Sequence, residues 1–113
     1  MEITSHLSHD TLVYTLVGSM DEPAAAALRD NIVAQVQVGV IHFVIDLSGV
    51  DFIDSAGLGM LVANLKTVYS RNGSIKLVGP TSEVLHVFEI TRLVKIFSIY
   101  PTVEAALLNQ IRV

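Results

Sequence analysis

Two kinds of hydrophobic pattern alternate along the chain. Residues 11–17 are rich in β-branched and aromatic side chains, which predicts a strand that stops at Gly18. Residues 2–7 are expected to pair with this strand across a turn at residues 9–10. From Pro23 onward the apolar positions recur every fourth residue, which predicts a helix with one buried face. That face is formed by Leu28, Ile32 and Val36.

The boundaries of this helix are marked by residues that favour helix ends. Asp21 is a suitable N-cap ahead of Pro23, and Gly39 is a suitable terminator. Residues 40–47 are apolar at nearly every position, which is typical of a central strand covered on both faces. A loop containing glycine is expected at residues 48–50.

The same alternation continues to the C-terminus. A second amphipathic helix is predicted to begin near Asp54 and to end near residues 72–73. The remaining predicted elements are a strand at residues 75–78, a short helix that opens at 80–82, a strand at 96–99 and a helix at 101–110. Helices that alternate with short apolar strands imply a largely parallel sheet. We therefore predict one α/β domain over residues 1–113, with a mixed, mostly parallel sheet of four to five strands and about four helices packed on it.

The composition supports a compact domain that has enough apolar residues for a core and for a partner surface. The 113 residues are 51% hydrophobic and 16% charged, and the mean hydropathy is +0.58. No apolar run approaches the roughly 20 residues that a membrane helix needs, and the N-terminus does not resemble a signal peptide. The absence of cysteine excludes disulfides and thiolate metal sites. These features predict a cytoplasmic protein without membrane insertion.

The charges argue against nucleic acid as a partner. Seven basic residues stand against eleven acidic ones, for a formal net charge of −4. The basic residues are scattered singly, whereas polyanion binding needs clustered cations. A protein or a small molecule is therefore the expected partner.

The richest candidate chemistry lies in residues 46–59, where a predicted buried strand leads into a helix. Asp54 is placed to cap that helix, and Ser55 then lies in its first turn near solvent. A phosphate on Ser55 would meet free backbone N–H groups and the positive end of the helix dipole. Asp54, together with Asp21 and Asp46 if the strand ends cluster, would oppose it. Phosphorylation is thus predicted to change the surface charge more than the fold.

Two glycines within this helix need an explanation, because each costs up to about 1 kcal/mol relative to alanine. Gly57 and Gly59 allow either tight packing of the helix on the sheet or close approach of a partner's backbone. In the second case Leu58 and Met60 are expected to be partly exposed as apolar contacts.

These residues carry a family resemblance. Asp46-Leu47 followed by Asp-Ser-Ala-Gly-Leu-Gly at residues 54–59 resembles the signature of STAS domains, and in particular of stand-alone anti-sigma factor antagonists. Residues 18–21 resemble the Gly-x-x-Asp that ends an early strand in that family. Ala56 departs from the pattern, since many members have serine or threonine there. Ser55 is therefore the only hydroxyl in the motif.

The resemblance implies a regulator rather than an enzyme, with no bound cofactor. The unmodified protein would bind an anti-sigma factor that is a serine kinase of the histidine-kinase-like ATPase class. The kinase would phosphorylate Ser55 and release it, and a PP2C-type phosphatase would reverse the step. Asp21, Asp46 and Asp54 would shape the surrounding surface. The residues expected to dock against the kinase are Gly57, Leu58, Gly59 and Met60.

The family also leaves other roles open for this chain. STAS domains serve as scaffold subunits of stressosomes and of lipid-transport complexes, and a weak homodimer is compatible with either role or with the antagonist role.

Three alternatives from other classes fit the residues less well. A nucleophile elbow needs glycine where Ile53 stands, and no histidine is evidently placed as its base. A dinucleotide fingerprint needs a third glycine. The four histidines lack metal-ligand spacing. Asp46, Asp51 and Asp54 suggest Mg²⁺, but turn and capping roles explain Asp51 and Asp54 more simply.

Overall fold

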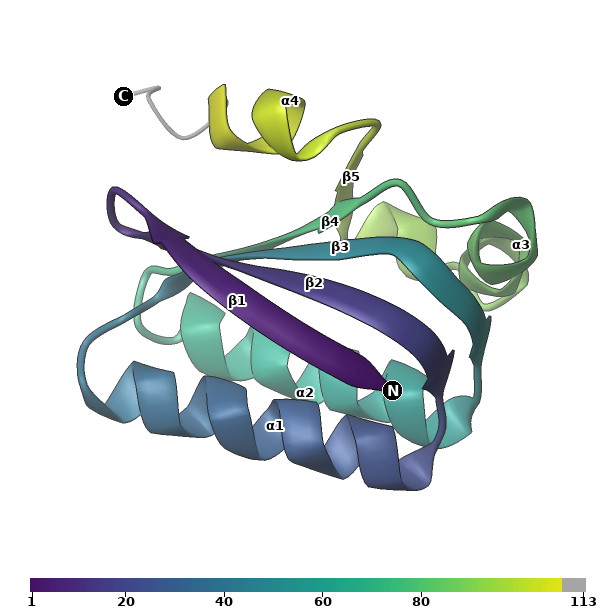
Figure 1. The fold of residues 1–113 in the computed structure, drawn as a ribbon, viewed down its shortest axis with the longest axis horizontal. Coiled ribbons are helices and arrows are strands. Elements are labelled where there is room, and N and C mark those ends of the chain that lie inside the picture. The colour runs from purple at the N-terminus through teal and green to yellow at the C-terminus, as the bar shows by residue number, and fades with distance from the viewer. Residues whose placement is uncertain (109–113) are drawn as a thin grey trace.

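The computed structural model describes residues 1–108, which form one five-stranded sheet in the order β1-β2-β3-β4-β5. Figure 1 shows the chain from the N-terminal hairpin to the last helix. The strands are β1 (Glu2–Ser8), β2 (Thr11–Met20), β3 (His42–Ile53), β4 (Ser74–Val78) and β5 (Ser98–Tyr100). The helices are α1 (Glu22–Gln37), α2 (Ser55–Tyr69), α3 (Ser82–Ile90), the 3₁₀ helix η1 (Leu93–Lys95) and α4 (Val103–Leu108).

The elements form layers around the sheet. β1 is antiparallel to β2, and each later strand is parallel to its neighbour. α1 and α2 lie side by side on one face, α4 lies on the other face, and α3 lies beside the far end of β3 (Figure 1). The predicted fold class, including the hairpin across residues 9–10, is confirmed. No helix within residues 1–108 is both long and apolar enough to cross a membrane.

The core is divided by the sheet into a large and a small part. β3 contributes to both, because successive side chains of a strand point to opposite faces. Phe43 and Ile45 face α1 and α2, whereas Val44 belongs to a smaller cluster beneath Ala106 of α4. The predicted central strand with two covered faces is thus confirmed.

The predicted loop at residues 48–50 is wrong, because these residues continue β3. β3 runs for twelve residues to Ile53, and β2 likewise runs past Gly18 to Met20 beside it. The pairing register shifts between Thr15 and Val17, opposite Gly49. A Cβ on Gly49 would lie 2.7 Å from the Leu16 carbonyl oxygen. The glycine therefore permits two strands to approach closely at an irregularity.

The C-terminal boundaries also differ from the prediction. The expected strand at 96–99 is displaced to Ser98–Tyr100, because Arg92 adopts a left-handed conformation and a 3₁₀ turn follows. Phe97 precedes the strand and packs edge-on against Phe88, with ring centroids 5.9 Å apart. The predicted helix at 101–110 is observed as Val103–Leu108, and residues 109–110 lie outside the described part of the chain.

Tyr14 links the sheet to α1 in the large part of the core. It is fully buried, its ring stacks on Phe43, and its hydroxyl donates a hydrogen bond to Oδ1 of Asn31. Burial raises the pKa of Tyr14 to about 12. An unfolded phenol titrates near 10, so the folded state holds this proton more tightly. The stabilisation linked to it is complete below about pH 10 and is lost as the pH rises toward 12.

Tyr14→Phe is therefore expected to remove part of the alkaline destabilisation of the fold. Urea unfolding at pH 9 and at pH 11 should show a smaller loss of stability in this variant than in the wild-type protein. Tyr69→Phe is the matched control, because Tyr69 is 63% exposed. Equal alkaline losses in the two variants would show that Tyr14 has no special part in the effect.

Candidate functional site

Two helices begin at the same edge of the sheet. Met20 at the end of β2 is paired with Ile53 at the end of β3. The backbone N–H of Asp54 donates to the Met20 carbonyl oxygen over 3.2 Å, which joins the two strand ends. α1 follows after Asp21 and α2 after Asp54, so both N-termini lie where parallel strands present their carboxyl ends. Function often collects at this edge of α/β sheets.

Both aspartates cap the helices that follow them, as predicted. Asp21 Oδ1 accepts a hydrogen bond from the Ala24 N–H over 3.1 Å, and Asp54 Oδ1 accepts one from the Gly57 N–H over 2.9 Å. Such caps contribute roughly 1 kcal/mol each. The caps also fix the Asp21 carboxylate beside the first turn of α1 and the Asp54 carboxylate beside the first turn of α2.

Ser55 is the first residue of α2 and its side chain is exposed. It stands at one end of a depression along this helix, called here the α2 groove. The groove consists of two adjoining hollows of about 470 and 410 Å³ that share Val62 and Lys66. Its lining residues are Ser55, Leu58, Gly59, Val62, Ala63, Leu65, Lys66, Tyr69, Thr91, Leu93, Lys95 and Ile96.

The α2 groove is apolar near Ser55 and basic at its other end. Lys95 lines only the hollow farther from Ser55, whereas Lys66 lines both hollows. Lys66 stands eleven positions along α2 from Ser55, or about 16 Å of helix rise. The charged residue that directly precedes Ser55 is Asp54, so a negative group on Ser55 would lie next to a like charge.

The two glycines of α2 have different surroundings. Gly57 is buried, and a Cβ there would lie 2.6 Å from Met20 Cγ and 2.8 Å from Ile53 Cγ1. Gly59 is exposed, and a Cβ there would meet nothing within 4 Å. Tight packing on the sheet thus explains Gly57 and does not explain Gly59.

Two residues expected at this surface lie elsewhere. Met60 is only 6% exposed and belongs to the core, so the expectation of a partly exposed Met60 is wrong; Leu58 is half-buried, as expected. Asp46 lies within β3 and pairs with Thr15, five positions before Met20 at the end of β2, or about 17 Å of strand. It accepts hydrogen bonds from the N–H and hydroxyl of Ser48. The long β3 therefore separates Asp46 from Asp21 and Asp54.

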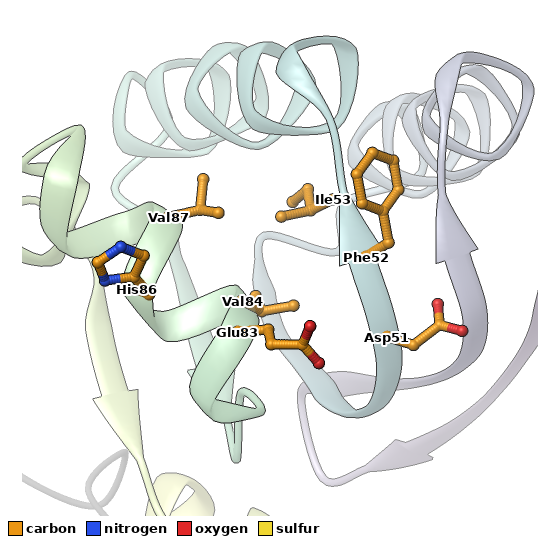
Figure 2. Close-up of a pocket in the computed structure, with 7 residues that line it drawn as sticks. All are labelled: Asp51, Phe52, Ile53, Glu83, Val84, His86 and Val87. Carbon is orange, nitrogen blue, oxygen red and sulfur yellow. The ribbon is translucent and has the colours of Figure 1, made fainter.

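A third hollow, near the same sheet edge, is not predicted from the sequence. It has a volume of about 300 Å³ and lies between the end of β3 and α3, with Ile53 on one side and Val84 on the other (Figure 2). Phe52 lines it and is 53% exposed. Asp51 lines it too and accepts a hydrogen bond from the Ser19 hydroxyl over 2.9 Å. The predicted loop at residues 48–50 ends the strand before Asp51 and Phe52, so the sequence pattern gives no sign of this surface.

The described residues do not assemble the alternative chemistries. Asp46, Asp51 and Asp54 accept hydrogen bonds from three separate places in the fold. Within residues 1–108 no group of three or more potential ligands could hold a metal. His86 lines the hollow at α3 rather than the α2 groove, and the other three histidines lie on β1, in the following turn and at the start of β3. No described histidine is therefore placed as a base for Ser55.

Comparison with known proteins decides the family. The STAS domain profile matches residues 2–106, which is nearly the whole chain. The chain belongs to the STAS domain family. Over 84 residues this STAS domain is 33% identical to the anti-sigma-B factor antagonist of Bacillus subtilis, covering 74% of the chain and 76% of the relative.

Solved structures agree with this assignment. The crystal structure of TM1081 from Thermotoga maritima matches with a TM-score of 0.93 at 26% identity, covering 97% of this STAS domain and 95% of TM1081. The Bacillus anti-sigma factor antagonist SpoIIAA matches with a TM-score of 0.77 in both its unphosphorylated and its phosphorylated form. The identities are 20% and 23%, and the matches cover 98% of this chain and 98% and 100% of SpoIIAA. These last matches show a shared fold.

Proposed function

We propose that this STAS domain is a non-enzymatic anti-sigma factor antagonist whose binding is switched off by phosphorylation of Ser55. The observation that carries the proposal is the position of Ser55, exposed at the capped N-terminus of α2 and at the end of an apolar groove. Its partner is an anti-sigma factor that is also an ATP-dependent serine kinase. The cycle takes place in the cytoplasm, where sigma factors and ATP are available.

The surface around Ser55 suits a kinase that both binds and modifies it. Leu58 and the exposed Gly59 lie one turn further along the groove and offer apolar contact and open backbone. Asp21 and Asp54 provide acidic groups that a basic surface of the kinase would complement. Gly57 and Met60 support this surface from beneath, through their contacts with the core.

Phosphorylation at this position should leave the fold intact and still disrupt the complex. The phosphate would face the first turn of α2, where the helix dipole favours negative charge. It would also add about −1.5 to −2 charges beside Asp54. Forcing like charges together at an interface costs several kcal/mol, and roughly 3–4 kcal/mol is a factor of several hundred in affinity. A PP2C-type phosphatase would restore binding.

The test is to incubate the protein with each anti-sigma factor kinase of the same genome and Mg-ATP, and to map phosphate by mass spectrometry. One kinase is expected to label Ser55 to near completion. Ser55→Ala should lose all labelling but keep its binding to that kinase. Ser70→Ala is the matched control, because Ser70 is an exposed serine at the other end of α2. Undiminished labelling of Ser55→Ala would refute the proposal.

A further inference from the structure

The N-terminal strand forms an edge of the sheet. β1 pairs with β2 on one side, and within the described residues no strand covers its other side. Edge strands present unpaired backbone groups, and natural proteins usually protect them with lysine, proline or a bulge. β1 has the sequence Glu-Ile-Thr-Ser-His-Leu-Ser and pairs with β2 in unbroken register. It contains none of these three protections.

Two observations indicate which residues of β1 point outward. In an antiparallel pair, residues alternate between facing their neighbour and facing away. The Thr4 hydroxyl donates to the Thr15 carbonyl oxygen over 3.5 Å, so that carbonyl faces β1 at the pair Thr4–Thr15. A two-residue turn joins Ser8 to Thr11, and the residues that flank such a turn form a hydrogen-bonded pair. Counting back along β1 from this pair gives the same alternation. The backbone groups of Ile3, Ser5 and Leu7 therefore face away from β2.

The side chains of the same three residues lie on the face of the sheet that α1 covers, where Ile3 packs against the core. They oppose Leu16, Tyr14 and Leu12, respectively, which belong to the large core cluster on the face of α1. α1 contacts β2 and α2, and β1 has no neighbouring strand on its outer side among residues 1–108; Figure 1 shows β1 at this edge of the sheet. Ser5 is exposed and Leu7 is 63% exposed. The edge thus combines outward backbone groups with an uncovered apolar side chain.

We infer that β1 is a self-association edge on which a second copy of this chain pairs antiparallel, with Ser5 opposite Ser5. This register places Ile3 of each copy opposite Leu7 of the other copy. It also places every outward-facing residue of β1 in a hydrogen-bonded pair with the second copy, because Ile3 and Leu7 lie at equal distances on either side of Ser5. The two sheets become one continuous sheet, with both α1 helices on the same face.

The side chains of β1 are complementary to themselves in this register. Ile3 and Leu7 give two apolar cross-strand pairs, which stabilise antiparallel strands. On the other face Thr4 lies opposite His6, and Glu2 lies opposite Ser8. No two like charges oppose each other directly. A second copy therefore fits the edge better than an extended segment of unrelated sequence, which would have to supply the same pattern.

Cysteine cross-linking tests the register directly, because the chain has no cysteine of its own. Hydrogen-bonded antiparallel pairs have Cα atoms about 5.5 Å apart, which lies within the disulfide range of about 4.4–6.8 Å. Ser5→Cys should therefore form covalent dimers in a mild redox buffer. Thr4→Cys is the matched control, because its two cysteines would be offset by two residues, about 8 Å apart and out of reach.

A mixture of two cysteine variants provides a second test of the register. Thr4→Cys and His6→Cys should each remain mostly monomeric alone and should form the mixed disulfide when combined, which mass spectrometry identifies by its intermediate mass. We expect Ser5→Cys to cross-link roughly tenfold more than Thr4→Cys at equal concentration. Equal cross-linking of the two, or no mixed disulfide in the mixture, would overturn the proposal. An edge that takes a segment of another protein would give that same negative result with the purified variants.

A third variant tests association without a cross-link. Ser5→Pro removes an outward N–H and keeps the ladder to β2, since proline is tolerated at such positions of edge strands. Its mass by light scattering should stay that of a monomer at concentrations where Ser5→Ala is partly dimeric. The proposal does not depend on the role of Ser55, and a chain with no kinase partner could still pass these tests.

Discussion

Ser55→Asp is expected to weaken binding of the protein to its anti-sigma factor kinase by about 10- to 300-fold, or roughly 1.4–3.4 kcal/mol. The aspartate places a permanent negative charge at the start of α2, next to Asp54. It carries one charge on a shorter side chain than phosphoserine, so its effect should be smaller than that of the phosphate. Isothermal titration calorimetry with the purified kinase measures the change.

Ser55→Asn is the control for size and shape, because asparagine matches aspartate without the charge. Its affinity for the kinase should lie within a few-fold of the wild-type value. Raising the salt concentration should reduce the difference in affinity between Ser55→Asn and Ser55→Asp. Equal weakening by asparagine and aspartate would mean that steric fit rather than charge governs the interface.

Gly57→Ala and Gly59→Ala are expected to change stability in opposite directions. The new methyl group at position 57 would collide with Met20 and Ile53. Overpacking of this kind costs about 1–3 kcal/mol. The methyl group at position 59 would point into open space, and replacing a helical glycine with alanine gains up to about 1 kcal/mol.

Urea denaturation of both variants beside the wild-type protein measures the difference. The two substitutions add the same group to the same helix, so each is a control for the other. A stabilising Gly57→Ala would contradict the packing role of Gly57. A Gly59→Ala variant that is more stable and yet binds the kinase less well would favour close approach of the partner at Gly59.

The parts of the site that follow from local chemistry could be predicted from the sequence. Asp21 and Asp54 act as caps because short acidic side chains accept hydrogen bonds from the free N–H groups of a first turn. Ser55 is exposed because it follows such a cap at the start of a helix. The buried face of α1 follows from residues spaced by four positions.

The parts that depend on contacts between distant segments could not be predicted in the same way. Ser48, Gly49 and Val50 look like a loop, yet pairing with β2 keeps them in β3. That extension moves Asp46 away from the strand end and creates the hollow beside Phe52. The α2 groove needs Leu93, which reaches it only because α3 is followed by a 3₁₀ turn. Helical spacing alone does not separate the buried Met60 from the half-buried Leu58.

The most direct test of the account is to measure the affinity of the kinase for the same preparation before and after stoichiometric phosphorylation of Ser55. A non-hydrolysable ATP analogue in the calorimeter cell prevents further transfer. Phosphorylation is expected to weaken binding by at least about 100-fold, while the circular dichroism spectrum and the urea midpoint change little. Equal affinities of the two forms would contradict it.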